Sequence, residues 1–241
     1  MPVAHIPFLH AVTSDAVLER GDFIASALRV MAAGGPRVAV HLRSGTLTGR
    51  ELTHLAEQLA SEQESTGAWL VINDRVDVAR AVGARAAQLT SRSISVADAR
   101  LAAPCLAIGA SVHDMDSAVT AAYDGAAWVV AGHVFDTPSH EGMPGRGLAF
   151  VKEISAAIAT PVIAIGGVRP QHVATLRIVG AAGVAAIRGV WSSDAESAGR
   201  AALDYLSAYD VSDASDRTAR GDDPGDDPGD DRGGDRGDRQ R

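Results

Sequence analysis

Short apolar runs rich in valine and isoleucine alternate with longer amphipathic stretches rich in alanine and leucine, and this alternation most constrains the fold. The runs are apolar almost throughout, which is typical of parallel strands covered on both faces. Eight strands are predicted, at 8–13, 37–43, 68–73, 86–89, 106–111, 128–133, 162–166 and 184–188. Helices are predicted near 15–33, 48–66, 75–82, 95–102, 114–124, 148–159, 170–179 and 194–208.

Eight strand–helix units within residues 6–209 predict an α/β protein with a single (β/α)8 TIM barrel. The alternative is a doubly wound open sheet, which calls for a glycine-rich turn after the first strand. The residues at that turn, 12–15, are Val-Thr-Ser-Asp and include no glycine. The barrel is therefore the favoured architecture.

The composition changes after Tyr209. Residues 210–241 carry 11 Asp and 6 Arg, about −5 of the net charge of −8, and almost no apolar side chains. Such a segment buries too little apolar surface to offset the entropy of ordering it. We therefore predict a barrel domain over 1–209 and a disordered tail over 210–241, which serves either as a solubilising extension or as an interaction segment.

Charge and apolar patterning exclude several classes of protein. The predicted barrel is mildly acidic, which argues against a nucleic-acid surface. Its apolar runs are shorter than a membrane span, so no membrane partner is expected. The one cysteine, Cys105, is expected to pack at the start of a strand and cannot form a disulfide within the chain. We expect a cytoplasmic protein.

His133 is the predicted catalytic residue. In a barrel enzyme the catalytic groups lie at the carboxyl ends of the strands, and His133 ends the sixth predicted strand, before a loop rich in glycine and proline. A histidine placed there can transfer protons near neutral pH. The alternative is a histidine that lines the core and bonds to backbone.

A phosphate site is predicted where strands seven and eight end. Gly166 and Gly167 allow backbone N–H groups to approach a ligand closely, and a helix begins just after them. Ile187 and Arg188 end strand eight, and the arginine can add a charge-assisted contact. The alternative for the two glycines is a turn required only by packing.

Arg43 is a cation at the end of the second predicted strand. An anionic group of the substrate would balance it, and the alternative is an ion pair with Asp74 or Asp77. No cluster of His, Asp and Glu has metal-ligand spacing, so no metal site is predicted.

These motifs resemble the thiamine phosphate synthase superfamily over 8–208, and in particular its thiazole tautomerase (TenI-like) branch. The superfamily resemblance rests on Ile-Asn-Asp-Arg at 72–75 and Ile-Gly-Gly at 165–167, and the branch on Gly-His-Val-Phe at 132–135 with Gly-Arg-Gly at 145–147. Further matches are Leu-His-Ala-Val-Thr at 9–13, His-Leu-Arg at 41–43 and Ser-Val-His at 111–113. The synthases carry proline where His133 stands.

Three departures from the synthase pattern affect pyrophosphate and metal binding. The motif Gln-Leu-Arg-Glu-Lys becomes His-Leu-Arg-Ser-Gly at 41–45, so its lysine is lost. The second metal carboxylate falls on Ser93, and a loop lysine falls on His140. Only Asp74 of the metal pair remains, which argues against magnesium-dependent pyrophosphate chemistry. A fourth departure concerns the phosphate site, where Arg188 stands in place of the usual serine.

The resemblance implies a reaction without a cofactor. The substrate would be a phosphorylated thiazole, the exocyclic-ylidene form of a carboxythiazole phosphate, which His133 would isomerise to the aromatic ring by proton transfer. Substrate-binding residues would be Arg43, Asn73, Ser111, Thr137, Gly166, Gly167, Ile187 and Arg188. The family also suggests a homodimer. The alternatives are a thiamine phosphate synthase, which is a transferase, and a regulatory protein that binds a thiazole or thiamine phosphate without catalysis.

Overall fold

The computed structural model describes residues 5–137, 142–191 and 194–220, with side chains as far as residue 215. Eight parallel strands form a closed barrel in which each strand pairs with the next along the chain and β8 pairs with β1. The strands are β1 (Leu9–Val12), β2 (Val38–Leu42), β3 (Trp69–Asn73), β4 (Ala86–Leu89), β5 (Ala107–Val112), β6 (Trp128–Gly132), β7 (Val162–Ile165) and β8 (Gly183–Ala186). The predicted (β/α)8 barrel is confirmed.

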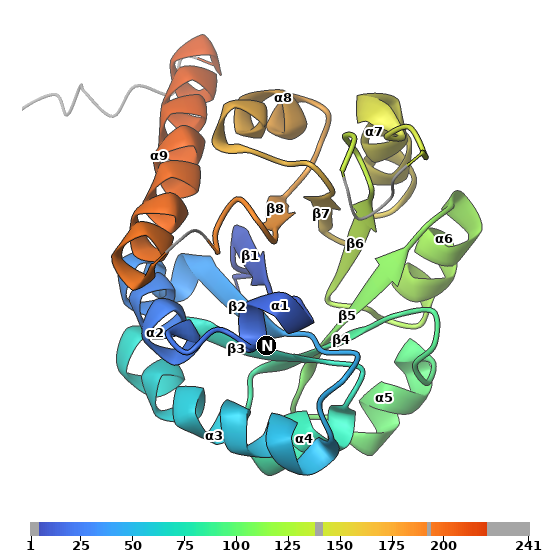
Figure 1. Cartoon of the computed structure of the whole chain (residues 1–241). Helices are drawn as coiled ribbons and strands as arrows, with labels where there is room; N and C mark the ends of the chain where they lie inside the picture. Colours follow the sequence, from blue (N-terminus) through green and yellow to red (C-terminus); the bar gives the residue numbers. More distant parts are fainter. Residues whose placement is uncertain (1–4, 138–141, 192–193, 221–241) are drawn as a thin grey trace, which may run out of the picture.

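Helices surround this barrel, and Figure 1 shows α9 lying along α2 where the ring closes. They are α1 (Asp15–Leu18), α2 (Phe23–Gly34), α3 (Gly49–Thr66), α4 (Val76–Ala81), α5 (Val96–Ala102), α6 (Met115–Tyr123), α7 (Gly147–Ala157), α8 (Val173–Ile178) and α9 (Ala195–Arg220). Two 3-10 turns, η1 (Gly35–Arg37) and η3 (Pro170–His172), precede β2 and α8.

Side chains cap the starts of several helices, α3 and α5 among them. Thr48 accepts from the backbone N–H of Glu51 while the Glu51 side chain accepts from Thr48, which forms a capping box at the start of α3. Ser95 caps α5 by accepting from the backbone N–H of Asp98 at 3.0 Å. These caps satisfy N–H groups that a helix start would otherwise leave unpaired.

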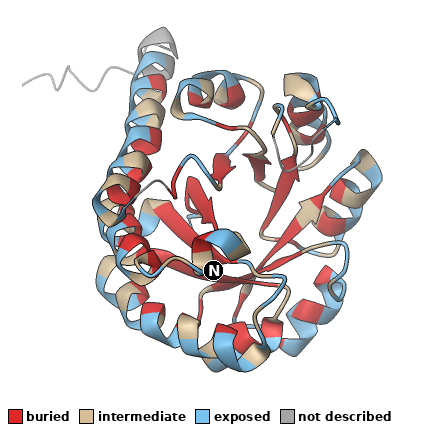
Figure 2. Ribbon diagram, in the orientation of Figure 1, coloured by how far each residue is buried: buried red, intermediate tan, exposed pale blue. Residues whose placement is uncertain are grey.

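Two layers of apolar side chains hold the barrel together. The outer layer lies between strands and helices, and Figure 2 shows the strands buried while the outward helix faces are exposed. The inner layer fills the barrel and includes Trp69, Trp128, Val130 and Ile163. The polar side chains His10, His41 and Gln88 are also buried on the strands. The interior of the barrel is therefore filled with side chains.

The carboxyl-terminal boundary differs from the prediction. Helix α9 continues from Ala195 to Arg220, so residues 210–220 are helical and not part of a disordered tail. Asp210 pairs with Arg37 at 2.6 Å, and Asp213 pairs with Arg177 at 2.8 Å. These ion pairs attach a segment with little apolar surface. The remainder of the predicted tail, 221–241, lies outside the described residues.

Two smaller expectations were wrong. Cys105 is exposed in the turn before β5 and does not pack in the core. The stretch 15–33 forms two helices, because a turn at Arg20 and Gly21 separates α1 from α2. Within the described residues, no helix is both long and apolar enough to cross a bilayer.

Candidate active site at the carboxyl end of the barrel

His133 follows β6 directly and is partly exposed at the barrel mouth. Its Nε2 atom lies 3.3 Å from the carbonyl oxygen of Met143, so the ring contacts the far side of its own loop. The backbone N–H of Arg146 donates to the His133 carbonyl at 3.0 Å. Both interactions place Met143 and Arg146 against His133.

The turn after β7 packs against this histidine. The N–H of Val134 donates to the carbonyl of Ile165 at 2.8 Å, and that of Phe135 donates to Gly166 at 2.9 Å. Gly166 has φ of +100°, and a Cβ added there would come 2.4 Å from the His133 Cβ. Glycine at 166 is therefore required for β7 to end beside the imidazole.

Gly167 bears on both alternatives considered from the sequence, a turn required by packing and a phosphate site. A Cβ on Gly167 would come 2.7 Å from the Asp136 carbonyl oxygen, so packing alone demands glycine there. Among the described residues, however, the N–H groups of Gly166 and Gly167 donate to no other protein group. An anion at the mouth could therefore accept hydrogen bonds from them.

Arg188 extends from the turn after β8 toward the loop after β6. Its Nη2 atom donates to Thr137 Oγ1 at 3.1 Å, and the guanidinium is exposed. Strand β8 ends at Ala186, so Ile187 and Arg188 belong to the following turn and not to the strand as predicted. Two of the predicted substrate-binding residues, Thr137 and Arg188, are thus in direct contact.

Arg43 is exposed after β2, and its backbone is fixed. Its N–H donates to Thr13 Oγ1 at 2.9 Å, and the same hydroxyl donates to the Arg43 carbonyl at 3.0 Å. In the described part of the chain its side chain has no carboxylate within ion-pair distance, and Asp77 pairs with Arg75 at 2.5 Å. The ion pairs considered for Arg43 from the sequence, with Asp74 or Asp77, are not formed.

Asp15 holds the loop after Arg43. Its Oδ1 atom accepts from Ser44 Oγ at 2.5 Å, from the Gly45 N–H at 3.0 Å and from Thr46 Oγ1 at 3.0 Å. The hydrogen bond from Ser44 is the main reason that the pKa of Asp15 is lowered. The sequence analysis did not select Asp15, because nothing local signals that α1 lies beside the loop after β2.

Asn73 is the last residue of β3, and Ser111 lies on β5. The side chain of each forms a hydrogen bond with a residue of the barrel interior. The Asn73 amide lies 3.3 Å from His41 Nδ1, and Ser111 Oγ accepts from Gln88 Nε2 at 3.1 Å. Within the described residues no hydrogen bond joins Arg43, Asn73 and Ser111 to one another. They therefore surround the mouth as separate polar points.

A magnesium site of the kind that the synthase resemblance implies does not fit the residues present. Asp74 Oδ1 accepts from the Ser93 hydroxyl and, at 2.6 Å, from Thr90 Oγ1. Across 5–137, 142–191 and 194–220 no group of three acidic, histidine or cysteine side chains lies close enough to hold a metal ion. One carboxylate already engaged by two hydroxyl groups makes a poor magnesium site, because Mg²⁺ requires oxygen ligands in octahedral geometry.

Residues 9–190 match the family described as thiamine monophosphate synthase. The chain belongs to that family. It is 38% identical to a thiamine-phosphate synthase of Methanoculleus marisnigri, over 82% of this chain and 94% of the relative. It is 36% identical to a thiamine-phosphate synthase of Chlorobium luteolum, over 89% of this chain and 98% of the relative.

A solved structure agrees with this assignment. The thiamine phosphate pyrophosphorylase of Pyrococcus furiosus superposes with a TM-score of 0.74 at 26% identity, covering 87% of this chain and 98% of its own. The superfamily predicted from the sequence is confirmed, whereas these relatives are named as synthases and not as tautomerases. His140, which takes the place of a synthase lysine, lies outside the described residues.

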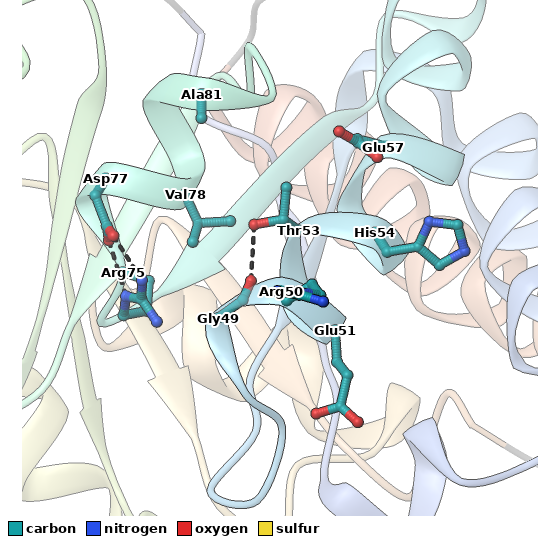
Figure 3. A pocket seen from close by; sticks show the side chains of 10 residues that line it. All are labelled: Gly49, Arg50, Glu51, Thr53, His54, Glu57, Arg75, Asp77, Val78 and Ala81. Atoms are coloured by element: carbon teal, nitrogen blue, oxygen red, sulfur yellow. Dashed lines mark hydrogen bonds and ion pairs between the residues drawn. The ribbon is translucent and has the colours of Figure 1, made fainter.

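A separate groove of about 840 Å³ lies between α3 and α4. Figure 3 shows its walls, including the Arg75–Asp77 ion pair and the bond from Thr53 to the Gly49 carbonyl. None of the predicted site residues lines it, and its charges already pair with one another or face solvent. We therefore assign the candidate active site to the barrel mouth.

Proposed function

We propose that this chain is a thiazole tautomerase that needs no cofactor. The observation that carries the proposal is the position of His133, an imidazole at the carboxyl end of β6 within the barrel mouth. The Asp74 carboxylate, which would hold magnesium in a synthase, accepts hydroxyl hydrogen bonds from Ser93 and Thr90. The mouth therefore suits proton transfer better than pyrophosphate departure.

The substrate is a carboxythiazole phosphate with an exocyclic double bond. The reaction breaks the C–H bond at ring carbon C2 and forms a C–H bond at the exocyclic carbon, while the double bond moves into the ring. Aromatisation supplies the driving force. The protein has to hold the ring in place and carry one proton between two carbons, for which a positioned base contributes on the order of 10²–10⁴-fold.

His133 is the group that carries this proton. Its Nε2 faces the Met143 carbonyl at 3.3 Å, and a carbonyl only accepts hydrogen bonds. Packing of the Gly166 turn against the histidine holds the ring at this position.

The phosphate and carboxylate of the substrate bind at the ends of different strands around the mouth. We assign the phosphate to the Gly166 and Gly167 N–H groups and to the turn of Ile187 and Arg188. We assign the carboxylate to Arg43, whose guanidinium has no carboxylate partner in the described structure. Asn73, Ser111 and Thr137 complete the polar lining, which binds a phosphorylated thiazole.

A second candidate is thiamine-phosphate synthase, and the names of the relatives at 38% and 36% identity favour it. One experiment separates the two functions. The protein is incubated with the thiazole tautomer alone, and in parallel with a thiazole phosphate, a pyrimidine pyrophosphate and magnesium. Aromatisation without pyrophosphate release supports the tautomerase, whereas magnesium-dependent pyrophosphate release establishes the synthase. Binding without either reaction would indicate a regulatory protein.

A further inference from the structure

A chain of hydrogen bonds runs through the barrel interior and ends at the candidate site. His10 Nε2 lies 3.0 Å from the Pro7 carbonyl, and His10 Nδ1 lies 2.8 Å from His41 Nε2. His41 Nδ1 in turn lies 3.3 Å from the Asn73 amide. Both imidazoles are buried, and the proposed reaction uses neither.

The donor and acceptor of each of these hydrogen bonds follow from the Pro7 carbonyl at one end. The Pro7 carbonyl only accepts, so His10 Nε2 carries a hydrogen. Burial lowers the pKa of His10 well below its usual value and that of His41 to about 4, so both rings are neutral near pH 7. A neutral ring carries one hydrogen. His10 Nδ1 therefore accepts from the Nε2–H of His41, and His41 Nδ1 is left as an acceptor.

The acceptor on His41 decides how the Asn73 amide is turned. The oxygen and nitrogen of a carboxamide are assigned from the surrounding hydrogen bonds. Two acceptors cannot bond to each other, so the NH₂ of Asn73 must face His41 and its oxygen must face the other way. That second atom of the amide has no partner among the described residues, and it is not sealed from solvent.

We propose that His10 and His41 are positioning residues that hold the Asn73 carbonyl oxygen toward the barrel mouth. This point of the site then recognises a hydrogen-bond donor on the ligand, such as a hydroxyl, an amino group or a protonated ring nitrogen. The inference rests on the interior hydrogen bonds and the neutrality of the two buried rings, so it holds for either reaction considered above.

The buried amide of Gln88 has the opposite effect at Ser111, where it leaves a hydrogen-bond donor for the ligand. Trp128 Nε1–H donates to Gln88 Oε1 at 2.8 Å, which turns the NH₂ of Gln88 toward Ser111 Oγ at 3.1 Å. The Ser111 oxygen accepts there, and its hydroxyl hydrogen remains for a ligand acceptor. The mouth thus offers an acceptor at the end of β3 and a donor on β5.

The ring tautomers test the inference in the unaltered full chain. Long-range ¹H–¹⁵N spectra of the labelled protein at neutral pH distinguish protonated from bare ring nitrogens, and His10→Gln and His41→Gln assign the two rings. We expect His10 and His41 each to carry hydrogen on Nε2 and none on Nδ1. A hydrogen on Nδ1 of His41 would overturn the proposal, whether the ring is the other tautomer or an imidazolium.

The Asn73 side-chain amide provides the second readout. In the wild type, one Nδ2 proton donates to His41 and exchanges slowly with solvent, and Asn73→Ser identifies its signal. His41→Gln can donate to His10 and accept from Asn73, so protection is retained. His41→Leu removes both bonds, and exchange becomes about tenfold faster or more.

Gln63→Met is the matched control for lost stability. Gln63 is a buried amide that bonds to the Gly83 carbonyl and the Leu70 N–H, away from the hydrogen bonds that join His10, His41 and Asn73. Protection of Asn73 should survive in that variant. The proposal fails if the Asn73 proton stays protected in His41→Leu. It also fails if Gln63→Met lowers that protection as much as His41→Leu does, because the two histidines then do not hold the amide.

Discussion

The hydroxyl of Ser93 donates to the carboxylate of Asp74, joining the turn after β4 to the residue that follows β3. Asp74 adopts the left-handed conformation, with φ of +62°, which aspartate tolerates better than most residues. Thr90 adds bonds to the same oxygen from its N–H at 3.1 Å and its hydroxyl at 2.6 Å. This carboxylate therefore serves the structure of the mouth.

Ser93→Asp should make the thermal stability of the protein depend on a bound cation. Two carboxylates would then meet without a hydroxyl between them, and their repulsion lowers stability unless a cation binds. We expect a lower melting temperature for Ser93→Asp, which millimolar magnesium restores, and no magnesium effect on the wild type or on Ser93→Asn. Thermal unfolding with and without magnesium measures this. A wild type that magnesium stabilises as strongly as the variant would contradict the account.

Arg188→Gln should weaken binding of a phosphorylated thiazole. Loss of a hydrogen bond to a charged group costs about 1.5–3 kcal/mol, which corresponds to roughly 10–150-fold in the dissociation constant. Thr137→Val removes only the neutral partner of Arg188 and should cost much less. Titration calorimetry with the aromatic thiazole phosphate gives both values. Equal affinity for wild type and Arg188→Gln would place the phosphate elsewhere.

Gly166→Ala should disturb His133, whereas Gly83→Ala should not. Both glycines have positive φ, +100° and +70°, so alanine is strained at each by about 1–2 kcal/mol. Only at 166 would the new Cβ meet the His133 Cβ, since nothing lies within 4 Å at 83. Urea unfolding and an aromatisation assay should show a larger stability loss, and a selective activity loss, for Gly166→Ala. Matching effects in the two variants would refute this packing role.

The buried histidines should make stability fall in mild acid. The folded pKa of His41 is about 4, below the usual 6.5, so between these values the unfolded chain binds a proton that the folded chain does not. Stability is full above about pH 6.5 and declines toward pH 4. His41 alone accounts for about 3 kcal/mol. Urea unfolding of wild type and His41→Gln across this range should show the steeper decline in the wild type, and parallel curves would exclude His41 as a source.

The sequence predicts the barrel well because its pattern is local. Each strand is a short apolar run, and all eight predicted runs coincide with observed strands to within one or two residues at each end. The end of α9 is less predictable, because Asp210 and Asp213 owe their order to Arg37 and Arg177 on other elements. Composition alone indicates disorder there, since ion pairs between distant residues leave no local pattern.

The site is predicted unevenly for the same physical reason. Residues just after strand ends, such as His133 and Arg188, lie at the mouth as predicted because the barrel fixes where strands end. The hydrogen bond between His10 and His41 is not predicted from the sequence. It depends on the register that sets β1 beside β2 and on the inward direction of each side chain. The orientation of the Asn73 side-chain amide follows only once the hydrogen bonds of these two histidines are known.

Proton NMR of the carboxythiazole phosphate tautomer tests the central claim most directly. The tautomer is mixed with catalytic amounts of wild type or His133→Ala, with a chelator present to remove adventitious metal. We expect rapid aromatisation by the wild type and a loss on the order of 10²-fold or more in the variant. An unchanged rate in His133→Ala, or no turnover by a folded wild type, would contradict the assignment of a tautomerase whose proton passes through His133.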